Sequence, residues 1–234
     1  MNYIITIMPI ILLILLTTEF PPYKFLGYLF SLAFLLLISG DIHSNPGPQS
    51  ESQFKFFHWN LNSICARGSV KIPLIETYNS VHHFDVFTIS ESMLDQSIRD
   101  DDIFIEGFSR EIYRSDHPSN SKTGGVCLYF REGLPIKRRP DLELLQELIV
   151  TELTICRKKL FLITLYRSPS QTSEQYEIFI DKLQVLLNHV RDERPYCLIL
   201  TGDFNCRSSQ WWEEDVESPE GAALDEVIET NDLH

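Results

Sequence analysis

Short apolar runs and helically spaced apolar positions follow one another from about Phe54 to the C-terminus. A continuous apolar run bounded by polar residues predicts a buried strand, whereas apolar residues three or four positions apart predict an amphipathic helix. The predicted strands cover residues 54–60, 85–91, 124–130, 148–155, 160–166 and 196–201, and the predicted helices cover residues 70–81, 173–191 and 221–230. Because strands outnumber helices and hairpins are present, the pattern favours an α+β sandwich of mixed sheets over a doubly wound parallel sheet.

Two of these elements carry signals for their ends. Arg157-Lys158-Lys159 separates two predicted strands, so we expect a hairpin with a charged turn. Ser173 stands at the start of the long helical pattern and is expected to cap that helix.

A different pattern opens the chain. Residues 3–16 and 25–38 are apolar runs, separated by a segment that contains Pro21-Pro22. Each run is shorter than the roughly 20 residues that span a bilayer. A secretory signal would have a Lys or Arg before its apolar run, and none precedes the first run here. Two short transmembrane helices, a membrane hairpin and a signal-like leader all remain open. We therefore expect residues 1–40 to be an apolar helical leader outside the domain core.

This leader also bears on location. Membrane association through residues 3–38 is expected if the leader is retained, and a cytoplasmic or nuclear protein is expected if it is removed.

The formal net charge of −13 is unusual for a nucleic-acid binder, but it is unevenly distributed. Residues 211–234 contain nine acidic side chains and no Lys or Arg, whereas residues 49–210 contain 22 acidic and 19 basic side chains. The body of the chain is therefore nearly neutral, which neither supplies nor excludes a local basic surface. We interpret the basic clusters 137–139 and 157–159 as solvated loops.

The five cysteines are odd in number and show no C-x-x-C spacing, so they suggest neither a disulfide framework nor a zinc site. Cys127, Cys156 and Cys197 lie in apolar runs and are expected to be small core residues. Reduced thiols indicate a cytosolic or nuclear setting for the globular part.

Polar side chains gather at the C-terminal ends of the predicted strands. They are Asn60 and Asn62, Glu91, Tyr166 and Arg167, and Asp203 and Asn205. One such residue is usually a turn former. Four such groups in one chain, each placed where loops present side chains over a rigid sheet, indicate a functional site.

Phosphodiester hydrolysis explains why these residue types would converge. A carboxylate such as Glu91 suits Mg²⁺, which prefers oxygen ligands and keeps several waters. Asn and Tyr side chains can donate hydrogen bonds to phosphoryl oxygens without adding negative charge. Asp203 could orient or deprotonate a water, with Asn205 fixing the phosphate or that carboxylate. For Arg167, a contact with a backbone phosphate and an internal salt bridge both remain open.

At these residues the chain resembles the endonuclease/exonuclease/phosphatase superfamily, and within it the apurinic/apyrimidinic-like endonuclease domain of non-LTR retrotransposons. The resemblance covers residues 54–234 and rests on an ordered set of segments. These are Trp59-Asn60-Leu61-Asn62-Ser63, Ile89-Ser90-Glu91-Ser92, Tyr113-Arg114-Ser115-Asp116 with Gly124-Gly125-Val126, Leu165-Tyr166-Arg167-Ser168-Pro169 and Thr201-Gly202-Asp203-Phe204-Asn205.

The resemblance implies a four-layer α/β/β/α sandwich that cleaves DNA with Mg²⁺ or Mn²⁺. It implies that Glu91 binds the metal, with Asn60 and Asn62 contacting phosphate and Asn62 supporting the metal. It also implies that Tyr166 bonds the scissile phosphate, and that Asp203 and Asn205 position the nucleophile and the phosphate. A reverse transcriptase domain is implied in the full-length parent element, and no oligomer is implied.

Residues 35–48, a Leu-rich run that leads into Asn45-Pro46-Gly47-Pro48, resemble viral 2A peptides and the 2A-like sequences of some retrotransposon proteins. His43 stands where those sequences usually have Glu. The resemblance implies that the ribosome skips the bond between Gly47 and Pro48, with residues 41–53 forming a linker before the domain at 54–234.

The family's later motifs end in Ser-Asp-His. In this chain only Asp232 and His234 are candidates for the Asp and the His of that motif. We therefore expect a domain truncated at its C-terminus, with activity weakened because general base catalysis contributes about 10²- to 10⁴-fold. A non-catalytic membrane-anchored remnant, and a phosphatase or phospholipase of the same superfamily, are the alternative functions.

Overall fold

A computed structural model of the chain describes residues 54–65, 71–117, 123–208, 210–211 and 218–233. The predicted leader, the Gly47–Pro48 bond and His234 lie outside these residues. The described strands are β1 (Phe56–Asn60), β2 (Val86–Ser90), β3 (Tyr113–Ser115), β4 (Val126–Phe130), β5 (Ile136–Arg138), β6 (Leu148–Ile155), β7 (Lys158–Tyr166) and β8 (Cys197–Asp203). The helices are α3 (Ile72–His82), α4 (Ser173–Asp192) and α5 (Pro219–Thr230), with short 3₁₀ turns at Asp100–Ile103 and Pro140–Leu142.

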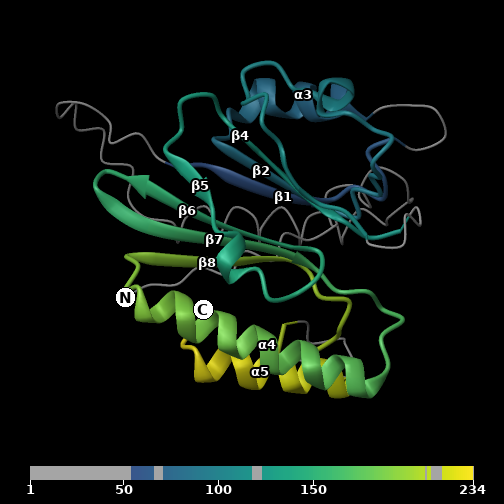
Figure 1. Cartoon of the computed structure of the whole chain (residues 1–234), viewed down its shortest axis with the longest axis vertical. Helices are drawn as coiled ribbons and strands as arrows, with labels where there is room; N and C mark the ends of the chain where they lie inside the picture. Colours follow the sequence, from purple (N-terminus) through teal and green to yellow (C-terminus); the bar gives the residue numbers. More distant parts are fainter. Residues whose placement is uncertain (1–53, 66–70, 118–122, 209, 212–217, 234) are drawn as a thin grey trace, which may run out of the picture. The chain divides into compact units, whose positions relative to one another are not determined.

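The strands form two four-stranded sheets, one in the order β1-β2-β4-β3 and the other in the order β5-β6-β7-β8. Pairing is parallel between β1 and β2 and between β7 and β8, and antiparallel between the other neighbours. Helix α3 covers one sheet, and helices α4 and α5 cover the other (Figure 1). This arrangement is the predicted α/β/β/α sandwich of mixed sheets.

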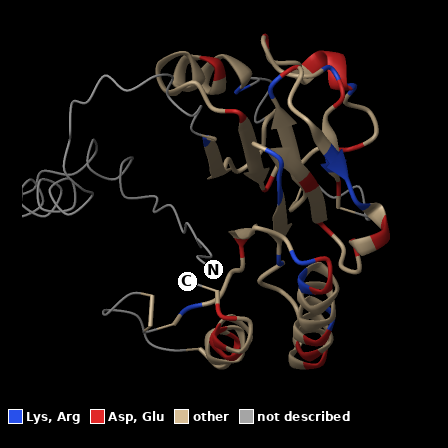
Figure 2. Ribbon diagram, turned by 90° about the vertical axis from the view of Figure 1, so that its left-hand side faces the viewer, with Lys and Arg blue, Asp and Glu red and all other residues tan. Residues whose placement is uncertain are grey.

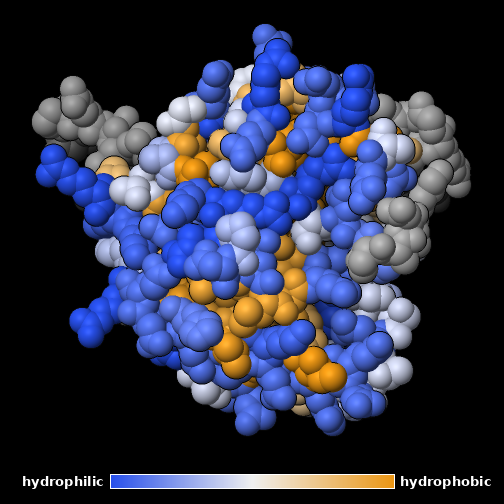
Figure 3. Space-filling view, viewed as in Figure 1, coloured by the Kyte–Doolittle hydropathy of each residue, from blue (hydrophilic) through white to orange (hydrophobic). Residues whose placement is uncertain are grey.

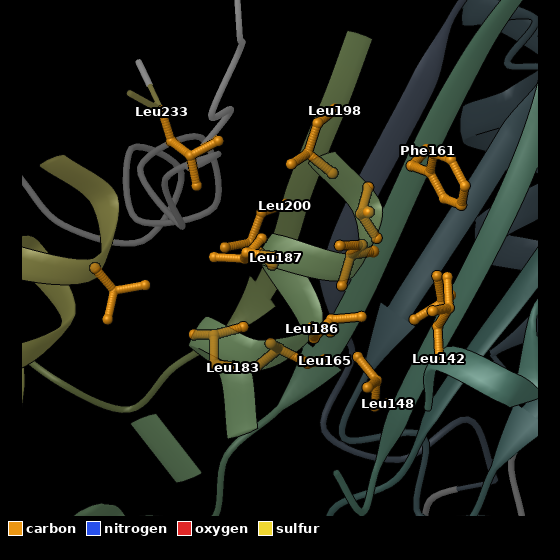
Figure 4. Packing of buried hydrophobic residues seen from close by; sticks show 14 of the residues in the cluster. Leu142, Leu148, Phe161, Leu165, Leu183, Leu186, Leu187, Leu198, Leu200 and Leu233 are labelled. Carbon is orange, nitrogen blue, oxygen red and sulfur yellow. The ribbon is translucent and has the colours of Figure 1, made fainter. Parts of the chain in front are cut away.

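Three apolar clusters fill the spaces between these layers. Ile75 of α3 packs with Phe87 and Ile89 of β2, whereas Val86 on the same strand faces the space between the sheets. This division follows from the strand period of two, which sends successive side chains to opposite faces. In the outermost cluster, leucines of α4 such as Leu183 meet leucines of β7 and β8 (Figure 4).

The structure corrects two predicted element ends. The hairpin turn between β6 and β7 is Cys156-Arg157, because Ile155 pairs directly with Lys158. Both turn residues have positive φ, as a tight two-residue turn requires. Helix α4 is capped by Thr172, not by Ser173, because the Thr172 hydroxyl accepts the Gln175 N–H while the Gln175 side chain accepts the Thr172 N–H.

The cysteines are all free. Their burial agrees with the predicted core position for some of them and not for others. Cys127 is buried and Cys197 is half-buried, but Cys156 is exposed because it occupies the hairpin turn. The expectation of a core position was therefore wrong for Cys156.

The basic clusters also differ from their interpretation as solvated loops. Lys137 and Arg138 belong to strand β5, and Arg138 pairs with Glu143 at 2.8 Å. Arg139 forms ion pairs with three carboxylates, those of Asp141, Glu152 and Glu193. Acidic and basic residues are interspersed along the ribbon (Figure 2), and strand β5 contains Lys137 and Arg138. Much of this basic charge is thus neutralised within the domain.

The surface of the domain is mainly hydrophilic on the face seen in Figure 3. Apolar surface gathers in the lower half of that view, in the region where Figure 1 shows α4. Ile178 and Val185 of α4 are among the exposed large apolar residues. None of the helices in the described ranges has the length and apolar character needed to cross a bilayer.

Candidate active site

The C-terminal ends of the two parallel strand pairs carry the residues singled out in the sequence. Asn60 ends β1, Glu91 directly follows β2, Tyr166 ends β7 and Asp203 ends β8. The Asn60 side-chain amide donates a 2.6 Å hydrogen bond to Asp203 Oδ2, which joins the ends of the two sheets. Residues 143 positions apart in the sequence therefore meet at one edge of the sandwich.

The loops after β1 and β2 are held together by their backbones. The Ser63 N–H donates to the Glu91 carbonyl at 2.7 Å, and the Asn60 side-chain oxygen accepts the Asn62 N–H at 3.1 Å. Asn62 is exposed and Glu91 is half-buried. This bonding holds the loop that carries the exposed Asn62 against the loop that carries Glu91.

Lys71 supports the same region from the start of α3. Its ammonium group donates to the carbonyl of Leu61 at 2.6 Å and to that of Asn62 at 3.0 Å. The sequence prediction missed Lys71, since it lies before a helix and not at the end of a strand.

Tyr166 is buried, with only 8% of its surface exposed. Burial raises the pKa of its hydroxyl to about 12, and the nearby carboxylates of Glu91 and Asp203 act in the same direction. A hydrogen bond with Asn205 opposes this rise in pKa. The phenol is therefore neutral at physiological pH and able to donate a hydrogen bond.

The loop after β8 is fixed by Asp203, Asn205 and Arg167. Asp203 Oδ1 accepts the Asn205 N–H at 3.0 Å, and the Asn205 side-chain amide donates to the Arg167 carbonyl at 2.7 Å. The Arg167 guanidinium is buried and donates to the carbonyls of Phe204 and Asn205. This geometry supports a positioning role for Arg167, whose guanidinium donates to backbone carbonyls.

Left-handed backbone conformations collect around these strand ends. Among non-glycine residues, positive φ occurs at Asn62 (46°), Glu91 (50°) and Asn205 (47°). Such conformations are uncommon outside glycine and persist where surrounding contacts enforce them, which is typical of functional sites. Asn adopts this conformation more readily than most residues, so Glu91 is the position where surrounding contacts must enforce it.

Glu147 is a residue of this region that the sequence analysis did not single out. Only 6% of it is exposed, it has a positive φ of 52°, and its Oε1 accepts the Gly125 N–H at 2.5 Å. Burial raises the pKa of its carboxyl group, and the Gly125 hydrogen bond partly offsets this. It was missed because it precedes strand β6, which runs antiparallel to β7 and so begins where β7 ends.

The available metal ligands are few. In the described ranges, no group of three or more His, Cys, Asp and Glu side chains is arranged to hold a metal ion. Mg²⁺ is nevertheless often held by one or two carboxylates and several waters. The Glu91 carboxylate, with the exposed Asn62 amide on the adjoining loop, fits such an open donor set.

Residues 160–234, which contain most of β7 and all of α4, β8 and α5, match the family model described as endonuclease-reverse transcriptase. Solved structures of one fold match over most of the chain. The chain shares the fold of endonucleases and a phosphatase whose structures are known.

Three solved structures illustrate this shared fold. The endonuclease domain of TRAS1, a telomere-specific non-LTR retrotransposon, is 17% identical with a TM-score of 0.58, and the match covers 78% of this chain and 72% of that one. The AP endonuclease LMAP from Leishmania major is 14% identical with a TM-score of 0.61, covering 81% and 70%. The 3′ phosphatase NExo from Neisseria is 21% identical with a TM-score of 0.52, covering 76% and 71%.

These low identities establish the shared fold and no more. No curated protein matches the chain. Proposals for the roles of individual residues therefore rest on the geometry of this chain.

Proposed function

We propose that the domain hydrolyses phosphodiester bonds and nicks DNA as the endonuclease of a non-LTR retrotransposon. The observation that carries this proposal is the hydrogen bond from Asn60 to Asp203, which joins the end of β1 to the end of β8. Strand β1 pairs in parallel with β2, and β8 pairs in parallel with β7, so Glu91 and Tyr166 lie at the same edge. The endonuclease-reverse transcriptase match at residues 160–234 supports it independently, since that segment contributes Tyr166, Asp203 and Asn205.

The proposed roles follow from what each side chain can donate or accept. The neutral Tyr166 hydroxyl and the Asn205 amide would donate hydrogen bonds to the scissile phosphate. Asp203 would orient the attacking water, because its carboxylate is held from two directions by Asn60 and by the Asn205 N–H. Asn60 therefore acts through Asp203 in this scheme, as well as toward the phosphate.

Glu91 and Asn62 would hold a divalent metal ion, Mg²⁺ or Mn²⁺. When bound, such an ion withdraws charge from phosphoryl oxygens and stabilises a leaving oxygen.

The proposed partner is DNA, which the loops at the C-terminal ends of the strands would contact. Arg138, Arg139 and Lys159 already pair with carboxylates of the domain, so they supply little free positive charge. DNA affinity should accordingly fall only moderately with salt, because that dependence scales with the number of phosphates neutralised. We also propose a reverse transcriptase as a functional partner, in line with the description of the matching family.

A plasmid-nicking assay tests the proposal. The protein is incubated with supercoiled plasmid and Mg²⁺ or Mn²⁺, and conversion to open circles is measured for wild type, Glu91→Ala and Glu106→Ala. Glu106 is exposed and lies outside the site, so it is a matched control. Wild type and Glu106→Ala should nick, and Glu91→Ala should lose at least about 100-fold in rate. Equal nicking by all three proteins, or none by wild type, would contradict the proposal.

The division of the chain into a leader (1–40), a linker (41–53) and the domain (54–234) is proposed on the sequence pattern alone. Cell-free translation of an open reading frame tagged at both ends tests the skipping proposal at Gly47–Pro48. Separate upstream and downstream products support it, and one full-length product contradicts it.

A further inference from the structure

The site residues are connected by a series of hydrogen bonds. One of these bonds is made by the side chain of Glu147, which has no role in the proposed hydrolysis as described above. On one side of the sandwich, Asn60 and Asp203 join the two sheets directly. On the other side, the connection between the Glu91 loop and Tyr166 passes through Glu147.

The first part of that connection is made of backbone groups. The Ser92 N–H donates to the Gly125 carbonyl at 3.1 Å, and the Met93 N–H donates to the Gly124 carbonyl at 2.9 Å. The segment that follows Glu91 is therefore fixed to the residues that lead into β4.

Glu147 makes the second part. Its side chain accepts the Gly125 N–H at 2.5 Å, and its own carbonyl accepts the Tyr166 N–H at 3.0 Å. One residue thus contacts the entry to β4 in one sheet through its side chain and the end of β7 in the other sheet through its backbone.

The two glycines leave room for this contact. A Cβ atom on Gly124 would lie 2.0 Å from Glu147 Oε1 and 3.0 Å from Tyr166 Cε1. Both glycines have positive φ, 66° at Gly124 and 82° at Gly125, which side chains rarely adopt. Gly124 therefore leaves room for the Glu147 carboxyl group and the Tyr166 ring, and Gly125 leaves room for the Ser92 hydroxyl, 2.6 Å from where its Cβ would lie.

We infer that Glu147 is a positioning residue for the proposed hydrolysis, holding Tyr166 and the Glu91 loop at a fixed separation across the two sheets. The inference rests on the proposed function for its catalytic consequence. Glu147 itself does not touch the substrate. A shift of about 1 Å in a catalytic group can cost about 100-fold in rate, so a contact of this kind controls turnover more than binding.

The test compares Glu147→Ala and Glu147→Gln with the control Glu106→Ala. Glutamine keeps an oxygen at the Oε1 position and can still accept the Gly125 N–H, whereas alanine cannot. Glu147→Ala should lower kcat for DNA cleavage about 10- to 100-fold with KM changed less than about threefold. Glu147→Gln should retain kcat within about threefold of wild type. A loss in Glu147→Ala that glutamine does not restore, or no loss beyond that of Glu106→Ala, would overturn the inference.

Hydrogen–deuterium exchange provides a readout that needs no activity. Glu147→Ala should speed exchange in the peptides that contain Gly125 and Met93, with α4 unchanged, while Glu147→Gln should match wild type. Uniformly faster exchange, or unchanged exchange at Gly125, would overturn the inference. If wild type does not cleave DNA, the proposed function fails, and exchange alone still decides whether Glu147 holds the two loops.

Discussion

Asn60 and Asp203 form a 2.6 Å hydrogen bond between the final residues of β1 and β8. Asn60 donates through its side-chain amide, and Asp203 accepts through Oδ2 while its Oδ1 accepts the Asn205 N–H. The bond connects the two sheets at their shared edge and orients the carboxylate proposed to act on water.

Replacing Asn60 by Asp should test this relationship most sharply. The substitution keeps the shape but places a second carboxylate against Asp203, and like charges at this distance repel. We expect a loss of about 1–3 kcal/mol in the free energy of unfolding and at least about 100-fold in cleavage rate. Denaturant unfolding and plasmid nicking measure the two effects. Asn188→Ala, at an exposed position of α4, is the control and should change neither. Wild-type stability and rate in Asn60→Asp would contradict the assignment.

Tyr166→Phe should lower the cleavage rate about 10- to 100-fold with little change in thermal stability, because the backbone bond to Glu147 survives. The pKa of Tyr166 is raised to about 12 in the folded chain, above the ordinary value of 10.0. The stabilisation of the fold by the neutral Tyr166 hydroxyl is therefore complete below about pH 10 and is lost as the pH rises toward about 12. A rate profile between pH 7 and 9.5 should show no inflection from this hydroxyl. A Tyr166→Phe variant as fast as wild type would remove it from the mechanism.

His58 should make the domain sensitive to mild acid. It lies on β1 two residues before Asn60, with Thr88 Oγ1 at 2.9 Å from one ring nitrogen and Ser90 Oγ at 3.3 Å from the other. Burial lowers the pKa of His58 from 6.5 to about 4, so the folded state binds this proton less readily than the unfolded state. Its contribution to stability is present above about pH 6.5 and is lost as the pH falls toward about 4.

Denaturant unfolding of wild type and His58→Phe over this pH range measures the effect. The loss of unfolding free energy between about pH 6.5 and 4 should be smaller in His58→Phe than in wild type. Substitution of the exposed His189 by Gln should leave the wild-type dependence intact. Identical pH dependence in wild type and His58→Phe would show that His58 does not titrate in this way.

Arg167→Lys should separate the positioning role from a phosphate contact. Lysine keeps the charge but cannot place two nitrogens on the carbonyls of Phe204 and Asn205. We expect a loss of about 1–3 kcal/mol in unfolding free energy and a slower rate, because the loop that carries Asn205 loses its support. The dependence of DNA affinity on salt should stay as in wild type. Arg167→Met removes the charge as well. If the slope of log DNA affinity against log salt concentration equals that of wild type in this variant, Arg167 has a positioning role. A slope reduced by about one would assign Arg167 to a phosphate contact.

The sequence indicated much of the fold, because alternation and helical spacing are local properties. Residues 85–91 and 196–201 were predicted as strands and became β2 and β8, since their apolar runs are buried on both faces. The short strand β5 carries Lys137 and Arg138 and could not be recognised by hydrophobicity. Its pairing with β6 on one side places it in the sheet.

The candidate site divides in the same way. The sequence by itself determined which polar residues end the strands, because Asn60, Glu91, Tyr166 and Asp203 each follow a mainly apolar run. Only the tertiary structure decided that Asn60 meets Asp203, that Arg167 turns inward, and that Glu147 reaches Gly125. These contacts depend on how two sheets stack and on the antiparallel course of β6, which bring distant residues together without leaving a local pattern in the sequence.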